Sequence, residues 1–421
     1  MAMCVEDRIS NFPDHIRCHI LSFLPIKAAV RTSIISTKWR YLFASISTIE
    51  FDRYLLRGLT HRNVDSFKNF VDRLLKLPDQ VSLDCFRLRD GISCNDGDHD
   101  FDVSGWICAA LRRGVKEIVL ELHNLGDVPP VLFTCHSLVT LRLDARGCKI
   151  EVPSEVCLGN LKTLQLIHWV LFGDDSIHRL ISNCHVLEDL AFIECFVENA
   201  RELHIQIPSL KSLVLHFVAR RDRDLNYGVV IDVPNLVYFR YNAAIVECYS
   251  HMKSLEKADI CIYGFHSNLS IDATHLIQGI CNVWYLSLNI HEVISGTSRL
   301  PIFHNLIEFK FCGRETSLME FLHCAPNLKT LTIRFLDFER TRWKALTIEV
   351  PSCLSFHLKE IEFSCFDTHM IEMVNYFLDN AIVLKKLIIS MDLLTWIQKA
   401  EASKQLLKLL KSSNKCLIVI L

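Results

Sequence analysis

A six-residue pattern recurs from about residue 115 onward: apolar, two free positions, apolar, one free position, apolar. Any one such hexamer is common in a chain that is 50% hydrophobic, so the near-constant spacing of 19 to 30 residues carries the signal. Lys also occupies the second position in six of the twelve copies, and a degenerate earlier copy begins at Leu83. The twelve copies begin at Val115, Leu138, Leu161, Leu187, Leu210, Leu236, Leu255, Val283, Leu306, Leu328, Leu358 and Leu384.

Each hexamer predicts one short β-strand. Side chains alternate along a strand, so the fourth and sixth residues point to the same, inward face. One strand cannot bury that face alone, and stacking the units gives a parallel sheet with a continuous core. This period and pattern are typical of leucine-rich repeats, an α/β solenoid with parallel strands on its concave face. We expect the intervening segments to return on the other side, as helices at Asp175–Cys184 and Ser317–Cys324.

The third and fifth residues of the hexamers are expected to line the concave face. Their charged members comprise six acids and five bases, interleaved with Thr, Ser, Tyr and Gln. A groove for nucleic acid needs a basic cluster, whereas a mixed surface suits a folded protein or peptide with its own charge pattern. The alternative is a solvated face without a ligand. The candidate target-binding residues are Arg142, Gln165, Asp189, Tyr238, Arg240, Asp259, Tyr285, Glu308 and Lys310.

The first block of the chain, residues 7–43, predicts three short amphipathic helices. Pro13 suits a first helical turn, and Pro25 ends the first helix and can begin the second. Ser36 is a candidate cap for a third helix that carries Trp39. A block of under 40 residues rarely folds alone, so it reads either as half of an interface or as a helix cluster packed on the rest of the protein.

The motif residues of this block resemble an F-box, the motif by which substrate receptors of SCF-type ubiquitin ligases dock onto a Skp-type adaptor. The match is ungapped and includes Leu24-Pro25 and Lys38-Trp39-Arg40, although Phe12 stands where the family usually has leucine. The resemblance implies an apolar helical interface, some of whose residues must instead form the motif's own core. The implied adaptor-binding residues are Phe12, Pro13, Ile16, Ile20, Leu21, Leu24, Pro25, Val30, Ile34, Trp39 and Leu42.

The carboxy-terminal end changes character. Residues from about Trp343 to Ile389 resemble the FBD domain that follows leucine-rich repeats in a large plant F-box family. We expect two further strands around a helix at Thr368–Asn380, which would close the end of the solenoid, since terminal repeats need a cap. The predicted domains are an F-box at 6–50, a helical linker at 51–80, the solenoid at 81–345 and an FBD-like region at 346–421.

Composition fits a folded protein of a reducing compartment. The net charge is −2, which argues against nucleic acid as the main partner. The 18 cysteines are dispersed among apolar neighbours and form no CxxC pair. Neither a secretory signal nor an 18-residue apolar run is found, so we expect no membrane association and a location in the nucleus, the cytoplasm or both.

Catalytic and cofactor motifs are not found. The sequence has no GxGxxG, GxxxxGK[ST] or GxSxG, so neither a nucleotide cradle nor a nucleophile elbow is indicated. His15 and His19 have helical spacing, but Ile16 stands where a zinc motif needs Glu. The acidic residues 96–102 fail a calcium loop at Phe101 and Ile107. We therefore predict no catalytic, metal or cofactor site.

Together these features predict a non-enzymatic substrate receptor of an SCF ubiquitin ligase. The F-box would dock onto the adaptor, and through it onto cullin and RING subunits, while the solenoid holds an unknown protein target. One alternative is a repeat scaffold that binds a protein without ubiquitination. The other is an enzyme that uses the pairs Cys135-His136 and Cys184-His185.

Overall fold

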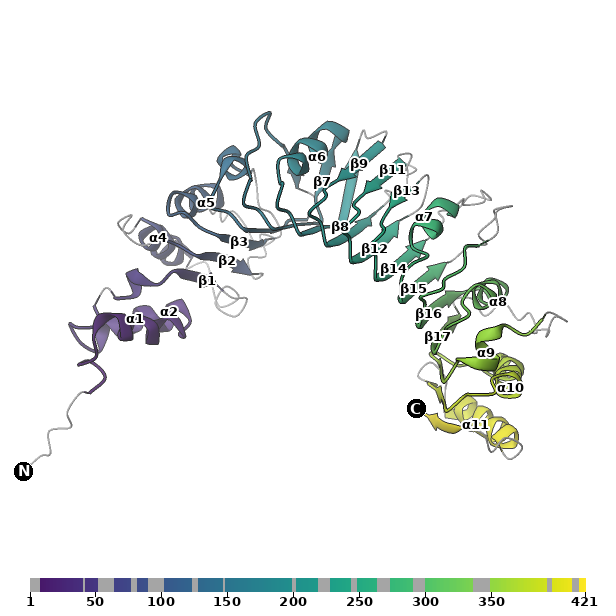
Figure 1. Cartoon of the computed structure of the whole chain (residues 1–421). Coiled ribbons are helices and arrows are strands. Elements are labelled where there is room, and N and C mark those ends of the chain that lie inside the picture. Colours follow the sequence, from purple (N-terminus) through teal and green to yellow (C-terminus); the bar gives the residue numbers. More distant parts are fainter. Residues whose placement is uncertain are drawn as a thin grey trace, which may run out of the picture. The chain divides into compact units, whose positions relative to one another are not determined.

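The computed structural model of the chain comprises two compact units, residues 1–200 and 201–421, which are described separately (Figure 1). In each unit a parallel sheet carries helices along one of its faces. We call the opposite face of each sheet the open face. The structure describes residues 8–40, 42–51, 64–76, 82–89, 102–122, 128–146, 148–198, 202–218, 228–243, 248–262, 273–290, 300–335, 349–391, 396–410 and 416–421.

Unit 1 begins with the helical block. Helix α1 (Asp14–Ser22) follows Pro13, and α2 (Ile26–Arg31) follows Pro25, so each proline stands just before a helix, where its missing N–H costs nothing. The 3-10 turn η1 (Thr32–Ile34) extends α2. The predicted third helix is shorter than expected: Trp39 lies in a turn, and the 3-10 helix η2 (Leu42–Ser45) follows.

In the described part of unit 1, the main sheet has six parallel strands, each in register with the next. They are β1 (Thr48–Phe51), β2 (Cys85–Arg89), β3 (Glu117–Glu121), β4 (Thr140–Asp144), β6 (Thr163–Ile167) and β8 (Asp189–Glu198). The hexamers at Leu83, Val115, Leu138, Leu161 and Leu187 supply five of them, as predicted. The helical elements between them are α4 (Val64–Leu75), α5 (Val103–Arg112), η4 (Pro130–Thr134) and α6 (Gly173–Ser182). The predicted helix at 175–184 is thus confirmed, two residues earlier.

Strand β1 was not predicted. It comes directly after the helical block and pairs along its whole length with β2. Its sequence repeats the hexamer pattern, with Ile46, Ile49 and Phe51 at the three apolar positions and all three buried. The next copy begins 37 residues later, at Leu83, which is outside the spacing of 19 to 30 residues that reveals the other copies. The sheet therefore begins before residue 51.

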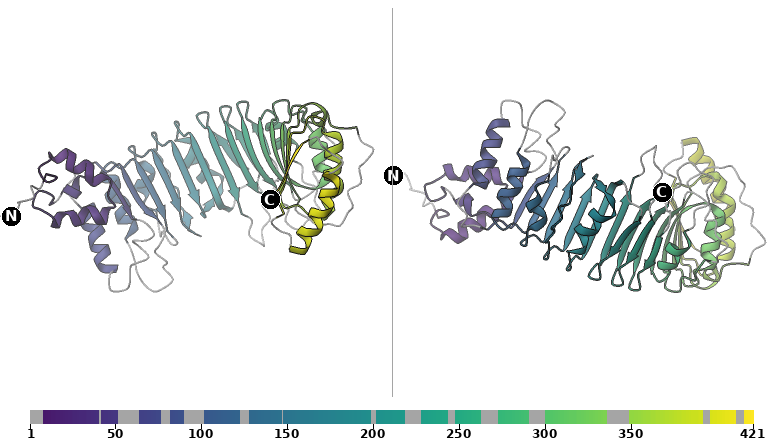
Figure 2. Two further views of the ribbon diagram at one scale, coloured as in Figure 1. Left: turned by 90° about the horizontal axis from the view of Figure 1, so that it is seen from below. Right: turned by 90° about the horizontal axis from the view of Figure 1, so that it is seen from above.

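Within its described residues, the main sheet of unit 2 has nine parallel strands, each paired with the next. They lie side by side in Figure 2. They are β10 (Ser212–Phe217), β12 (Tyr238–Ala243), β14 (Lys257–Ile262), β15 (Tyr285–Ile290), β16 (Glu308–Gly313), β17 (Thr330–Phe335), β18 (Glu360–Phe363), β19 (Lys386–Ile389) and β20 (Leu417–Ile420). The FBD-like region thus continues the sheet, with β18 and β19 on either side of η5 (Thr368–Met370) and α10 (Ile371–Asn380) in sequence, as expected.

The return segments of unit 2 differ from repeat to repeat. Four more helices cover the sheet: α7 (Thr274–Gly279), α8 (Glu315–His323), α9 (Ser352–Phe356) and α11 (Trp396–Leu410). The helix predicted at 317–324 is confirmed as α8. Three return segments instead form strands, β9 (Glu202–Gln206), β11 (Gly228–Asp232) and β13 (Cys248–His251), in a small parallel sheet. In unit 1, β5 (Lys149–Ile150) and β7 (Val170–Phe172) pair in the same way, and β7 also pairs with the end of β8.

The core follows the hexamer. In β4, Leu141 and Leu143 are buried together with the preceding Leu138, whereas Thr140 and Arg142 lie on the open face. The same alternation holds in β10, β15 and β16. Each fully buried Leu side chain contributes about 1.5–3 kcal/mol relative to an exposed one. The predicted inward fourth and sixth positions are therefore confirmed.

Asparagines link neighbouring repeats. In four repeats an Asn directly before the hexamer donates from Nδ2 to a backbone carbonyl of the preceding repeat. Asn305 bonds Asn282 O at 3.2 Å, and Asn327 bonds His304 O at 2.8 Å. Asn160 reaches His136 O, and Asn235 reaches Pro208 O. These bonds give partners to backbone carbonyls that lie in loops before the strands and so have no partner in the sheet.

Candidate functional site

The helical block has a small core centred on Trp39. The indole Nε1–H donates to Ser10 Oγ at 2.8 Å, and the buried Arg17 guanidinium lies 5.9 Å from the indole ring centre. Arg17 also donates to the Lys38 carbonyl and pairs with Asp14. A buried charge is tolerated only when it is paired and hydrogen-bonded. Arg17 therefore fixes α1 against the turn that carries Trp39.

The structure divides the candidate adaptor-binding residues by exposure. Leu21 and Trp39 are buried, so in this conformation they belong to the block's own core. Six are exposed and form the accessible part of the set: Phe12, Pro13, Ile16, Leu24, Pro25 and Ile34. Three are half-buried: Ile20, Val30 and Leu42.

Three further exposed apolar residues of the block were not among the candidates. Ile9 lies before α1, Phe23 follows it with 74% of its surface exposed, and Ile35 follows Ile34 with 68% exposed. Ile34 itself is 87% exposed. A contiguous apolar patch on a surface usually marks an interaction site, whereas single exposed apolar residues are normal. Phe23 and Ile35 could have been found from their position directly beside motif residues.

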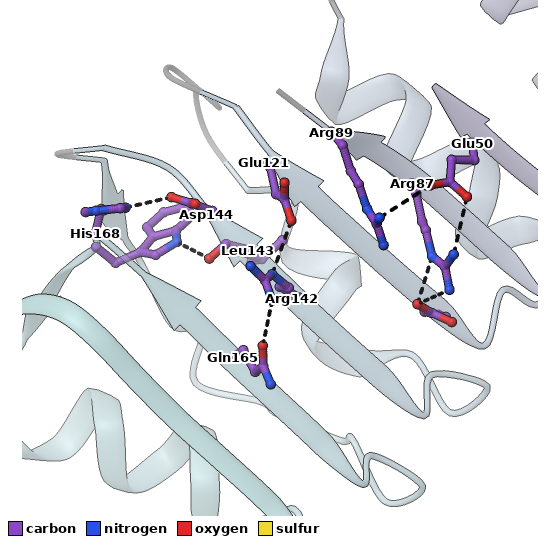
Figure 3. A network of polar contacts seen from close by, with 11 residues as sticks. Glu50, Arg87, Arg89, Glu121, Arg142, Leu143, Asp144, Gln165 and His168 are labelled. Carbon is purple, nitrogen blue, oxygen red and sulfur yellow. Dashed lines mark hydrogen bonds and ion pairs between the residues drawn. The ribbon is translucent and has the colours of Figure 1, made fainter. Parts of the chain in front are cut away.

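Paired charges cover the open face of unit 1 (Figure 3). Arg87 on β2 reaches Glu117 on β3 at 2.8 Å and Glu50 on β1 at 3.3 Å. Glu50 also lies 3.6 Å from Arg89. Each arginine thus joins side chains of adjacent strands, and the predicted mixture of acids and bases is a set of cross-strand ion pairs.

The same pattern continues on β4, β6 and β8, where three candidate target-binding residues lie. Arg142 Nη1 donates to Gln165 Oε1 at 3.3 Å, and Arg142 Nε lies 3.4 Å from Glu121. Asp189 on β8 accepts a bond of 3.5 Å from Thr163 Oγ1. Arg142 and Gln165 are therefore in contact on the open face, with Asp189 further along the same sheet.

His168 also lies at the open face but was not predicted. Its Nδ1 is 2.8 Å from Asp144, and its Nε2 is 3.0 Å from Glu194 (Figure 3 shows the first contact). His168 has a positive φ of 62°, unusual for a residue with a side chain. The adjoining Trp169 is fully buried and donates to Leu143 O at 3.0 Å, which holds this turn in place.

Six candidate residues lie on the open face of unit 2. Arg240 on β12 is 3.3 Å from Asp259 on β14. Lys310 on β16 is 3.6 Å from Glu308 and 5.4 Å from the ring centre of Tyr285. Burial opposes the charge of Lys310, but Tyr285 and Glu308 outweigh it and raise the pKa of the ammonium.

Tyr238 is the sixth of these residues and faces Lys257 in the next strand. Burial, followed by the nearby Asp259, raises the pKa of Tyr238. The phenol is therefore neutral at physiological pH and offers a half-buried aromatic surface. Tyr and Arg side chains, such as Tyr238 and Arg240, are enriched in the centres of protein interfaces.

Comparison with known proteins matches three family profiles to this chain. The F-box domain profile matches residues 9–49 and the FBD profile residues 347–389. The profile for the LRR repeats of the FBD-associated F-box protein At5g56370 matches residues 103–262. The putative F-box/FBD/LRR-repeat protein At3g59240 of Arabidopsis thaliana is 32% identical over 398 residues, which cover 88% of this chain and 77% of that protein.

This chain belongs to the plant F-box/FBD/LRR-repeat family. Two further A. thaliana relatives of the family are similar over most of the chain. The putative F-box/LRR-repeat protein At3g49150 is 34% identical, over 83% of this chain and 60% of its own length. The putative FBD-associated F-box protein At5g50270 is 28% identical, over 91% and 97%. The family resemblance inferred from the motifs is confirmed.

The cysteines of this F-box/FBD/LRR-repeat protein differ sharply in environment. Burial raises the pKa of Cys184 to about 12, and its Sγ donates to Leu180 O. Cys135 lies 3.2 Å from Ser137 Oγ, whereas His136 faces the exposed Cys157, 3.7 Å from Nδ1. Of the two adjacent pairs in the sequence, Cys184-His185 contains a buried, unreactive thiol. In the other pair, the thiol that contacts His136 is that of Cys157 and not that of Cys135.

Other chemistry receives no support within the described ranges. They contain no cluster of three His, Cys, Asp or Glu side chains arranged to hold a metal ion. No helix among them is both long and apolar enough to cross a membrane. The acidic residues 96–101, which the calcium-loop comparison used, lie outside the described part of the F-box/FBD/LRR-repeat chain.

Proposed function

We propose that this F-box/FBD/LRR-repeat protein is the substrate-recognition subunit of an SCF (Skp–cullin–F-box) E3 ubiquitin ligase. Residues 6–50 would dock onto a Skp-type adaptor, which connects to the cullin and RING subunits. The repeat array, about 81–345, would hold a protein target on its open face, and 346–421 would complete the array. Such a complex would act in the nucleus, the cytoplasm or both.

The observation that carries this proposal is the exposed apolar surface of the helical block. Phe12, Leu24 and Ile34 are exposed even though the block has its own core around Leu21 and Trp39. Large exposed apolar side chains promote aggregation unless a partner buries them. A helical partner that packs on the block would bury them. The receptor itself needs no bond chemistry. Tethering raises the effective concentration of target lysines near a ubiquitin-charged enzyme.

Co-purification with a plant Skp-type adaptor tests the proposal. Leu24→Asp combined with Ile34→Asp should abolish adaptor binding, because each change places a charge in the apolar interface. The matched control is Ile302→Asp with Ile382→Asp, which alters two equally apolar exposed residues of unit 2 and should bind normally. Failure of the wild-type chain to bind, or equal binding by both variants, would favour a non-ligase scaffold.

A further inference from the structure

The repeated lysine at the second hexamer position has no role in the core. This position lies in the turn just before each strand, so its residues stack in a column at the rim of the sheet. Each backbone N–H bonds the carbonyl of the residue before it in the column. In unit 2 the column runs from Lys211 through Val237 and Glu256 to Lys385. We call its part formed by Trp284, Ile307, Lys329, Lys359 and Lys385 the rim column.

Three lysines are consecutive in the rim column. Lys359 N donates to Lys329 O at 2.8 Å, and Lys385 N donates to Lys359 O at 2.8 Å. Adjacent strands lie about 4.8 Å apart, so the three lysines span about 10 Å. All three are exposed. Three ammonium groups therefore project from neighbouring rungs on the same rim.

The corresponding lysines of unit 1 are neutralised within their own column. Lys116 lies 2.7 Å from Asp84, and Lys162 lies 3.3 Å from Glu188. Asp84 and Glu188 are themselves second-position residues of adjacent repeats. Within the described residues, no ion pair involves the three lysines of the rim column. Like charges directly opposite each other destabilise a sheet, so an external anion would relieve their repulsion.

Two apolar residues come directly before the lysines in the rim column. Ile307 N donates to Trp284 O at 2.9 Å, and Lys329 N donates to Ile307 O at 2.9 Å, so the two apolar residues continue the same line. Ile307 is 38% exposed, and the Lys257 ammonium lies 4.9 Å from the Trp284 ring centre. Two apolar residues followed by three lysines predict a ligand with an apolar part followed by an anionic part.

Neighbouring charges distinguish among anionic partners. Glu308 and Glu360 lie next to the column on the open face, paired with Lys310 and Lys386. A continuous phosphate backbone would meet these carboxylates, whereas a single peptide strand can follow the rim alone. Lysine is a point-charge donor that binds carboxylate and phosphate alike, so the choice between them rests on the neighbouring carboxylates.

We propose that the rim column binds an acidic protein segment. The segment is extended, places an apolar residue against Trp284 and Ile307, and continues with about three residues of Asp or Glu over the lysines, since an extended chain rises about 3.3 Å per residue. This inference rests on the proposed function, of which it specifies the target class.

Fluorescence anisotropy of a labelled LFEDEDE peptide on the full-length chain, purified with its adaptor, tests the inference. Replacing Lys329, Lys359 and Lys385 together with Gln should weaken binding about tenfold, since exposed charge contacts each contribute a few-fold. The control replaces the exposed Lys76, Lys253 and Lys404 with Gln and should change binding less than about twofold, because surface charges away from a contact matter little. The uncharged peptide LFQNQNQ should bind no better than the triple variant binds LFEDEDE.

Equal binding by the two triple variants would overturn the inference, as would tighter binding of a DNA duplex that depends on the same three lysines. Adaptor co-purification is recorded in every sample. Loss of peptide binding with the adaptor retained refutes only the rim column. Peptide binding by a chain that captures no adaptor refutes only the ligase proposal.

Discussion

The indole Nε1–H of Trp39 donates a hydrogen bond to Oγ of Ser10, 2.8 Å away, inside the helical block. Both residues are buried, although Ser10 precedes the first helix. This bond ties the chain before α1 to the turn after η1 and leaves Phe12 and Ile34 outside. The surface proposed to bind the adaptor therefore depends on a buried polar contact that it does not include.

Ser10→Ala should loosen the block. The buried indole N–H loses its partner, at a cost of about 1 kcal/mol. Local opening should rise about fivefold, since 1.4 kcal/mol corresponds to a factor of ten. Hydrogen–deuterium exchange of peptides covering α1 and α2 measures it. Ser22→Ala is the control, because the Ser22 hydroxyl is exposed and bonds the carbonyl of His19 within its own helix. Identical exchange in the two variants would contradict the assigned role of Ser10.

Leu21 and Phe23 should separate stability from binding. Leu21 is fully buried, so Leu21→Ala should destabilise the block by about 2–5 kcal/mol and raise exchange throughout α1. Phe23 is largely exposed, so Phe23→Ser should change stability by less than about 0.5 kcal/mol. It should nevertheless weaken adaptor capture. Unchanged capture would remove Phe23 from the interface.

The hexamers predicted most strands because alternation is a local property: Leu141 and Leu143 must share a face in any strand. The division of the block was not predictable in the same way. Leu21 lies near the end of α1 and Leu24 just beyond it, and both are apolar, so only tertiary packing decides that Leu21 is internal and Leu24 exposed. Strand β1 carries the same pattern as the others, but α4 and its flanking segments separate it from β2 and break the period.

The return segments show a second limit. The residues Glu202 to Gln206 alternate like a strand, but the connection in which they lie is long enough for either a helix or a strand. Pairing with β11 decides the outcome, and that contact joins residues 26 positions apart, as Glu202 and Gly228 show. The contact of His136 with Cys157 is equally non-local, whereas the sequence draws attention to the adjacent Cys135.

The asparagine bonds between repeats should contribute independently of side-chain burial. Asn305→Ala and Asn327→Ala each remove a donor to a loop carbonyl and should cost about 1 kcal/mol. Exchange of peptides within residues 300–335 should increase in each variant. Asn282→Ala is the matched control, because Asn282 takes part through its backbone carbonyl, which the substitution retains. An equal effect of Asn282→Ala would show that the side-chain bonds are unimportant.

Cysteine labelling should follow exposure. Burial raises the pKa of Cys184 and Cys195 to about 12, so both thiols remain protonated and covered at neutral pH. Cys157 is exposed beside His136 and should react first with N-ethylmaleimide, as measured by peptide mass spectrometry. In the denatured chain the three should react at similar rates. Early labelling of Cys195 in the folded chain would contradict the packing of β8.

Asp84 should titrate below its ordinary range. Its hydrogen bond with Lys116, then that with Ser47, lowers the pKa of the carboxyl. The pair therefore contributes stability above the ordinary Asp pKa and loses it as the pH falls through the lower, folded value. Both side chains are partly exposed, so the contribution is below about 1 kcal/mol. NMR titration of Lys116→Gln should show the Asp84 pKa moving back upward; an unchanged value would exclude this pairing in solution.

Strand β1 has a mechanical consequence. Ser47 O accepts bonds from both Asp84 N and Cys85 N, and β1 then pairs with β2 through Phe51. The helical block thus continues directly into the first strands of the sheet. A partner bound to the block would therefore also fix the orientation of these strands. A target bound to these strands would present its lysines to the ubiquitin-charged enzyme in a fixed orientation. Inserting glycines between the block and β1 should make the choice of modified lysines less specific.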